Sequence, residues 1–208
     1  MTGTTPFVRP YRPADLPALY DICLRTADAG QDASASYAEP DRDLVGAIFA
    51  APYAVLEPDL TFVVDDGGGQ TVGYIVGTGD TARFVERFRA EWLPSVAGRW
   101  PAPAGEPGTP AESMAVLLHL PERMVVPALA SYPAHLHIDL LPRAQRSGHG
   151  RALMTAYLAA LAAKGVPAVH LGMLSTNTSA RAFYDRLGFH EIPVPDAGPL
   201  TYLGRATS

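Results

Sequence analysis

The chain has 208 residues, of which 48% are hydrophobic and 18% charged, so it can bury a sizeable core and we expect one domain over residues 1–208. Its 16 basic and 21 acidic residues give a formal net charge of −5, and without a lysine or arginine cluster this disfavours nucleic-acid binding. A single cysteine, Cys23, excludes a disulfide within the chain and a cysteine-rich metal site, and we expect no metal. The sequence shows neither a signal pattern nor a long apolar run, which predicts a cytoplasmic protein that contacts no membrane.

The N-terminal half is expected to mix short strands with short helices. Strands are predicted at 7–12, 60–65 and 71–77. Helices are predicted at 14–26, 43–49 and 82–93. The sequence Asp-Gly-Gly-Gly at 66–69 joins two of these strands and predicts a hairpin turn. A polar loop at 27–40 separates the first two helices, and loops of this kind commonly hold recognition residues.

The C-terminal half has a more regular pattern. Residues 95–110 hold four prolines and three glycines, which predicts an irregular loop, either a lid or disordered. A helix at 111–129 is expected to break near its two internal prolines. The remaining strands are predicted at 135–141, 168–174, 189–192 and 201–205, and the remaining helices at 148–164 and 177–187. A strand, helix, strand order implies a right-handed parallel crossover, so we expect an α/β fold with a mixed central sheet flanked by helices.

A glycine-rich segment lies between a predicted strand end and a helix start, with the sequence Gln145-Arg146-Ser147-Gly148-His149-Gly150. Glycine lets a backbone approach a ligand closely, and the free N–H groups of a first helical turn carry partial positive charge. With Arg146 and Arg151 alongside, the segment is suited to a pyrophosphate. The alternative is a segment that merely turns the chain.

A second motif follows one strand later, from Asn177 to Phe189, with the pattern Asn-x-x-Ala-x-x-Phe-Tyr-x-x-x-Gly-Phe. Together with Gln-x-x-Gly-x-Gly, about thirty residues earlier, it resembles the GCN5-related N-acetyltransferase (GNAT) superfamily. The resemblance covers roughly residues 135–189. It implies the GNAT fold, in which a splayed parallel strand pair lies within a mixed sheet. The segments 26–32 and 132–142 further resemble bacterial proteins similar to the acetyltransferase-like C-terminal domain of O-GlcNAc hydrolases.

The resemblance also implies where acetyl-CoA, the expected co-substrate, would bind. The pantetheine arm would bond the backbone between the diverging strands 135–141 and 168–174, and the pyrophosphate would lie on the amides of 146–151. The implied cofactor-binding residues are Leu140, Leu141, Gln145, Arg146, Ser147, Gly148, His149, Gly150, Arg151, Asn177, Ala180, Phe183 and Tyr184. His149 departs from the family pattern, which usually has an aliphatic residue there.

Acyl transfer from a thioester needs a neutral amine, a donor for the developing oxyanion and a proton for the thiolate. By resemblance, the N–H of Leu140 would polarise the thioester carbonyl and Tyr184 would protonate the thiolate. His137 and Asp139 share a strand face about 7 Å apart, and either could accept the proton of the amine. The alternative for His137 is a hydrogen-bonded core histidine.

The acceptor side is less defined by the sequence. Asp28 and Asp32 could attract a cationic amine, or they could simply belong to a solvated loop. Four upstream aromatic residues are expected in the core rather than around a substrate: Tyr20, Phe49, Tyr53 and Phe62. Cys23, on the apolar face of a helix, is expected to be an inert buried thiol.

The sequence therefore predicts an acetyl-CoA-dependent N-acetyltransferase that acts by direct transfer. The expected acceptor is a small-molecule or peptide amine, and the expected state is a monomer or a homodimer. The alternative is a non-catalytic acyl-CoA-binding or protein-interaction module that retains the cleft. A nucleotide-binding oxidoreductase is disfavoured because no Gly-x-Gly-x-x-Gly follows an early strand.

Overall fold

A seven-stranded sheet organises the chain, and its strand order is β1-β2-β3-β4-β5-β7-β6. The structure is a computed structural model that describes residues 5–208. The strands are β1 (Phe7–Pro10), β2 (Phe62–Asp65), β3 (Thr71–Thr78), β4 (Ala134–Leu140), β5 (Ala168–Leu174), β6 (His190–Ile192) and β7 (Leu200–Ala206). The sheet is mixed, as predicted, because β4 and β5 are parallel whereas the other neighbouring strands are antiparallel.

The parallel pair diverges soon after it begins. Strands β4 and β5 are in register only at Ala134 with Val169 and at His135 with His170. Beyond that point β4 stays paired with β3 as far as Leu140, whereas β5 stays paired with β7 along its whole length. Each strand follows its antiparallel neighbour, and a V-shaped gap opens between their carboxyl ends. The predicted splayed pair is therefore confirmed.

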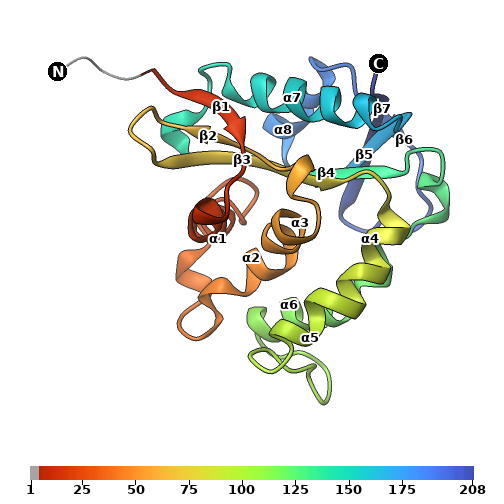
Figure 1. The fold of residues 1–208 in the computed structure, drawn as a ribbon. Helices are drawn as coiled ribbons and strands as arrows, with labels where there is room; N and C mark the ends of the chain where they lie inside the picture. The colour runs from red at the N-terminus through yellow and green to blue at the C-terminus, as the bar shows by residue number, and fades with distance from the viewer. Residues whose placement is uncertain (1–4) are drawn as a thin grey trace.

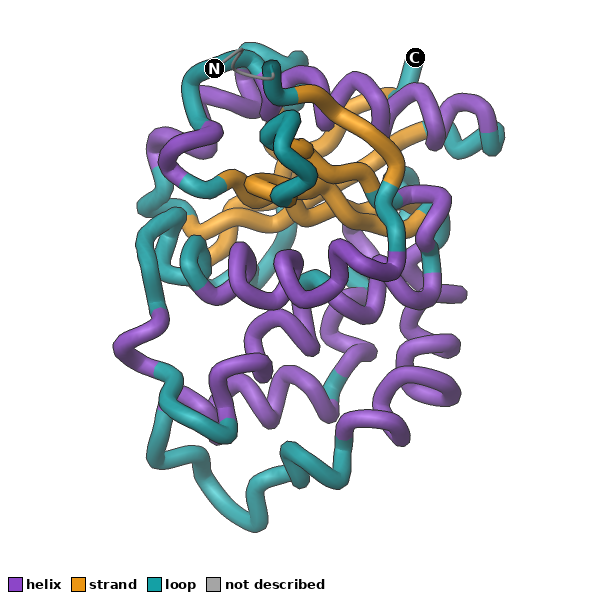
Figure 2. Tube along the Cα trace, turned by 60° about the vertical axis from the view of Figure 1, so that its left-hand side comes forward, coloured by secondary structure: helices purple, strands orange, loops and turns teal. Residues whose placement is uncertain are grey.

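Helices cover both faces of the sheet (Figure 1). Their bounds are α1 (Leu16–Leu24), α2 (Leu44–Phe49), α3 (Ala51–Leu56), α4 (Thr81–Arg87), α5 (Leu93–Val96), α6 (Pro110–His119), α7 (His149–Ala163) and α8 (Thr178–Asp185). Helices α7 and α8 lie on one side, and α1 to α3 lie on the other. The segment from α4 to α6 extends the second side away from the sheet, and Figure 2 shows this thick helical layer on one side of the strands. Within this layer α6 packs on α2.

Strand β3 lies at the centre of these layers, and all eight of its residues are buried. This burial explains its run of Val, Ile and Tyr, because a strand covered on both faces has no solvated side. The hairpin before it turns as predicted, since Gly67 and Gly69 adopt φ of 86° and 88°. The Asp65 carboxylate accepts hydrogen bonds from both glycine amides, at 2.9 and 3.0 Å.

Some boundaries differ from the sequence predictions. Helix α3 was not predicted, since its six residues are nearly all apolar and show no helical periodicity. The helix predicted at 82–93 is interrupted by a π-helical stretch at Phe88–Trp92. Its aromatic face is nonetheless buried, and the Trp92 indole N–H donates to the Ala47 carbonyl at 2.8 Å. Among residues 5–208, no helix has both the length and the apolar character needed to cross a membrane.

Candidate active site

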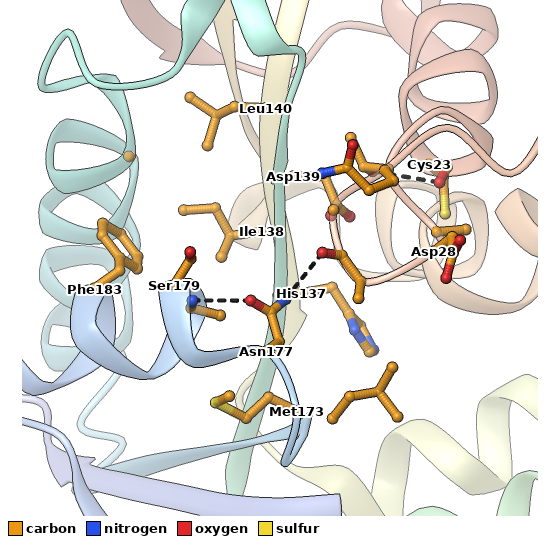
Figure 3. A pocket seen from close by; sticks show the side chains of 18 of the residues that line it. Cys23, Asp28, His137, Ile138, Asp139, Leu140, Met173, Asn177, Ser179 and Phe183 are labelled. Carbon is orange, nitrogen blue, oxygen red and sulfur yellow. Dashed lines mark hydrogen bonds between the residues drawn. The ribbon is translucent and has the colours of Figure 1, made fainter.

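A cavity of about 1100 Å³ opens where β4 and β5 diverge. One half is lined by the strand ends, the start of α7 and the first turns of α8, and the other by the loop after α1 together with α2 and α6. Figure 3 shows Phe183 and Ser179 on one side of β4, Cys23 and Asp28 on the other, and Asn177 between them. The motifs that the sequence places far apart thus border one space.

The backbone of Leu140 faces this cavity. The amide of the next residue, Leu141, donates to the Val72 carbonyl on β3 at 3.0 Å. Amide directions alternate along a strand, so the Leu140 N–H points to the opposite side, where β5 has already diverged. That N–H has no partner on a neighbouring strand, so it is available to donate to a thioester carbonyl. Leu141 itself is buried, its amide is already bonded and it does not line the cavity, so we leave it out of the proposed cofactor site.

The glycine-rich loop forms the entrance to α7. Gly148 caps the helix with φ of 86°, and a side chain there would meet no atom within 4 Å, so the space beside it is open. A Cβ on Gly150 would lie 3.1 Å from the Phe183 ring, so this glycine lets α8 pack against the first turn of α7. Arg146 and Arg151 line the cavity, and neither guanidinium is in an ion pair among the described residues.

Other side chains of the loop hold it in place. The Gln145 amide donates to the Leu140 carbonyl at 2.9 Å, which ties the loop to the strand end. The Ser147 hydroxyl donates to the Ala144 carbonyl at 3.0 Å. Neither Ser147 nor His149 lines the cavity, so these two residues can contribute to anion binding only through the shape and amides of the loop.

Asn177 connects the two sides of the cavity. Its Oδ1 accepts the Ala180 amide at 3.0 Å and so caps α8, and its Nδ2 donates to the Ala29 carbonyl at 3.3 Å (Figure 3). Ala180 and Phe183 follow along the same helix and also line the cavity. The structure thus brings these three predicted residues together.

Tyr184 lies between two aromatic rings and also lines the cavity. Its ring centre is 5.2 Å from that of Phe183 and 5.4 Å from that of Phe189. Burial, and secondarily the charge of Asp139, raises the pKa of the phenol above its usual value, so the hydroxyl stays protonated at neutral pH. Within residues 5–208 this hydroxyl makes no hydrogen bond, unlike a tyrosine anchored in a core through its oxygen.

Asp139 lies on β4 beside α1. Its Oδ2 accepts the Tyr74 hydroxyl at 2.6 Å. Burial raises the pKa of the carboxyl, while hydrogen bonds from Tyr74 and Thr26 act in the opposite direction. The net shift is upward, which moves the group toward the range in which a base works near neutral pH. Cys23 lines the cavity nearby, and burial raises the pKa of its thiol, which keeps it protonated and unreactive.

His137 is the other candidate base, and it differs from Asp139. Its Nε2 lies 3.3 Å from the Tyr53 hydroxyl, and its ring makes a T-shaped contact with Phe49, with the ring centres 5.6 Å apart. Burial, with the nearby positive charge of Arg123, lowers its pKa to about 4. The ring is therefore neutral at pH 7 and only weakly basic.

The two aspartates of the polar loop separate in space. Asp28 is exposed and lines the cavity. Asp32 does not line it, because its carboxylate accepts the Ser34 amide at 2.8 Å and lies 4.0 Å from Arg25. We therefore leave Asp32 out of the proposed acceptor site.

Several cavity residues were missed in the sequence. Phe49, expected in the core, lines the cavity. Tyr37, Val45, Pro110 and Met114 line the same half, which makes the far end of the cavity largely apolar. No local pattern marks these residues, because they meet only when α6 packs on α2. In the part of the chain that the structure describes, no group of three or more His, Cys, Asp or Glu side chains is arranged to hold a metal ion.

Comparisons with known proteins agree with this arrangement. The model of the acetyltransferase (GNAT) family matches residues 114–189, which contain the diverging strands and both motifs. The chain is also 61% identical to a solved structure described as SsHAT, with a TM-score of 0.94, over 98% of this chain and 99% of that chain. The chain belongs to the acetyltransferase (GNAT) family.

More distant similarities extend this comparison. The protein O-GlcNAcase of Rattus norvegicus is 26% identical over 96% of this chain, and the chain spans 22% of the length of that relative. This confirms the predicted resemblance to O-GlcNAc hydrolases. A structure of a putative acetyltransferase, yncA from Salmonella typhimurium, with its cofactor acetyl-CoA, shares the fold with a TM-score of 0.55 at 15% identity, over 98% of this chain and 95% of that chain.

Proposed function

We propose that the protein is an acetyl-CoA-dependent N-acetyltransferase that moves the acetyl group directly to an amine. The observation that carries this proposal is the V between β4 and β5, with the Leu140 amide facing it and the α7 loop at one end. An anion site at a helix N-terminus and a free strand edge are what a long thioester with a pyrophosphate needs. The acetyl-CoA named in the description of the yncA structure supports the choice of donor.

The residues divide the chemistry among themselves. The loop at 145–151 binds the pyrophosphate through its amides and through Arg146 and Arg151. Leu140 donates its N–H to the thioester oxygen, where negative charge develops during attack. Asp139 takes the proton that the amine loses, since its pKa is the one raised toward neutrality. Tyr184 gives its proton to the departing thiolate.

The acceptor would enter the half of the cavity lined by the loop after α1. Asp28, exposed at this side, favours an amine that arrives as a cation. The apolar end formed by α2 and α6 favours an acceptor whose amine is attached to an apolar body. Small-molecule and peptide amines both meet this description.

Acetyl-CoA is expected to raise the melting temperature, because a ligand that binds only the folded state stabilises it by mass action. Gly148→Val is expected to abolish the shift, since its side chain would occupy the open space beside the loop. The measurement is a melting curve with and without millimolar acetyl-CoA.

A matched control is available at the other end of the same helix. Gly165 also has positive φ, 71°, and also has open space beside it. Gly165→Val introduces the same backbone strain, of about 1–3 kcal/mol, but should retain the full acetyl-CoA shift. An unshifted melting curve for the wild-type protein would reject acetyl-CoA as the donor.

Tyr74→Phe is expected to move the acidic limb of the kcat/KM profile to higher pH. The Tyr74 hydroxyl stabilises the charged form of Asp139, so its loss raises the pKa of the carboxyl further. A base acts when deprotonated, and activity therefore appears only at higher pH. Tyr157→Phe, which removes a buried hydroxyl that donates to backbone carbonyls, should leave the limb in place. An unmoved limb in Tyr74→Phe would show that Asp139 does not set it.

A further inference from the structure

A chain of hydrogen bonds runs through the buried side chains beneath β4 and ends at the cavity. The Thr81 hydroxyl donates to the Pro133 carbonyl at 2.8 Å and lies 2.8 Å from Nδ1 of His135. Nε2 of His135 lies 2.7 Å from the Tyr53 hydroxyl, which in turn lies 3.3 Å from Nε2 of His137. The residues come from α3, α4 and β4.

The position of each proton in this chain follows from its fixed end. A carbonyl can only accept, so the Thr81 hydroxyl donates its one proton to the Pro133 carbonyl. Its oxygen must then accept a hydrogen bond from Nδ1–H of His135. His135 therefore carries its proton on Nδ1, and its Nε2 accepts from Tyr53. Tyr53 has then used its proton, so its oxygen accepts from Nε2 of His137. The Met124 sulfur, 3.5 Å from the Tyr53 oxygen, is a weaker and more distant competitor for that proton.

This assignment holds because both imidazoles are neutral. Burial lowers the pKa of His135 well below its usual value, and the neighbouring His170, His137 and Arg123 add to the effect. The pKa of His137 is lowered to about 4, chiefly by burial. A neutral ring has one N–H and one lone pair, so a proton fixed on Nε2 leaves the lone pair on Nδ1.

Nδ1 of His137 is open to the cavity. His137 is half-buried and lines the cavity, and among the described residues its Nδ1 has no hydrogen-bond partner. A fully enclosed atom without a partner would be a buried unsatisfied group, and in residues 5–208 the Trp100 indole nitrogen is the one side-chain atom of that kind. The lone pair on Nδ1 therefore reaches accessible space.

We infer that His137 is a substrate-binding residue whose Nδ1 accepts a hydrogen bond from the N–H of the acceptor amine. Thr81, His135 and Tyr53 are positioning residues, because they fix the tautomer that makes Nδ1 an acceptor rather than a donor. This inference rests on the proposed function, since it needs an amine in the cavity. It assigns Asp139 to proton removal and His137 to holding the amine with its lone pair turned toward the thioester.

The tautomer is tested without any substrate. Long-range proton–nitrogen correlation spectra of ¹⁵N-labelled protein at pH 7 distinguish protonated from bare ring nitrogens, and a His137→Asn variant identifies the His137 signals among six histidines. The expected result is a proton on Nε2 of His137 and on Nδ1 of His135. A proton on Nδ1 of His137 in the wild-type protein overturns the inference.

Tyr53→Phe interrupts the series of hydrogen bonds, so the His137 ring is expected to be no longer held in one tautomer. Nδ1 should become partly protonated, and the KM for the amine should rise about 3- to 10-fold with the KM for acetyl-CoA unchanged, the worth of one hydrogen bond. Thr81→Val, which leaves Tyr53 in place, should act in the same direction by freeing His135. Tyr157→Phe removes a hydroxyl that donates to the His135 carbonyl outside the chain, and it should change neither readout.

The outcomes separate this inference from the function itself. If both Tyr53→Phe and Thr81→Val leave the His137 tautomer and the KM for the amine unchanged, the hydrogen bonds do not fix the ring and the inference is overturned. If acetyl-CoA does not raise the melting temperature of the wild-type protein, the proposed function is rejected. The spectra would then still show whether the hydrogen bonds from Thr81 to His137 hold the His137 ring in one tautomer.

Discussion

Tyr184→Phe is expected to lower turnover by about 100-fold or more, the usual contribution of a positioned general acid. The substitution retains the ring between Phe183 and Phe189 and removes only the hydroxyl. That hydroxyl has no hydrogen-bond partner within residues 5–208, so the melting temperature and the acetyl-CoA shift should stay nearly unchanged. Steady-state kinetics and melting curves on the one variant provide both readouts.

Tyr157→Phe serves as the opposite case. The Tyr157 hydroxyl donates to the carbonyls of Thr78 and His135 and lies in the core, so its loss should lower stability by about 1 kcal/mol and leave turnover intact. If Tyr184→Phe behaved in the same way, its hydroxyl would be structural. Full activity in Tyr184→Phe would remove the hydroxyl from the mechanism.

Asp139→Asn is expected to reduce turnover by about 100-fold or more while acetyl-CoA binding is retained. Asparagine occupies nearly the same volume and can still accept the Tyr74 hydroxyl through its oxygen. It cannot take a proton from the amine. The measurement compares kcat with the acetyl-CoA melting shift, and the effect should fall on kcat alone.

The control for this variant is Asp28→Asn. Asp28 is exposed and has no place in the proton transfer, so this change should raise the KM of a cationic amine with little change in kcat. Equal turnover in Asp139→Asn and the wild-type protein would exclude Asp139 as the base.

The residues proposed to bind the cofactor could be picked out in the sequence because their signals are local. Glycines at a strand-to-helix junction and a long periodic helix place α7 and its loop without knowledge of the rest of the chain. The pattern from Asn177 onward similarly places α8. The direction of the Leu140 amide was implied only by the family resemblance, and in the structure it follows from the register with β3, because the adjacent Leu141 amide bonds to Val72. Leu141 is left out of the proposed site because its amide bonds to β3, which only the sheet register shows.

The acceptor half was not predictable because it depends on contacts between distant segments. Met114 reaches the cavity only through the packing of α6 on α2, across a loop rich in proline. Tyr53 and His137 are 84 residues apart in sequence, and their contact requires helix α3, which has no periodic signal. Asp32 resembled Asp28 in the sequence, yet the local turn at Ser34 holds its carboxylate elsewhere.

The hydrogen bond from Asn177 to Ala29 has a consequence for how the acceptor enters. It is long, at 3.3 Å, and exposed, so its net contribution is at most about 1 kcal/mol. Breaking this one bond would let the turn that carries Ala29 separate from α8 while every helix and strand stays intact. Asn177 retains a second amide proton that could bond the pantetheine. The residue proposed to hold the pantetheine therefore also borders the entrance through which the amine would reach the cavity. Occupancy by one substrate would then alter the rate at which the other is admitted.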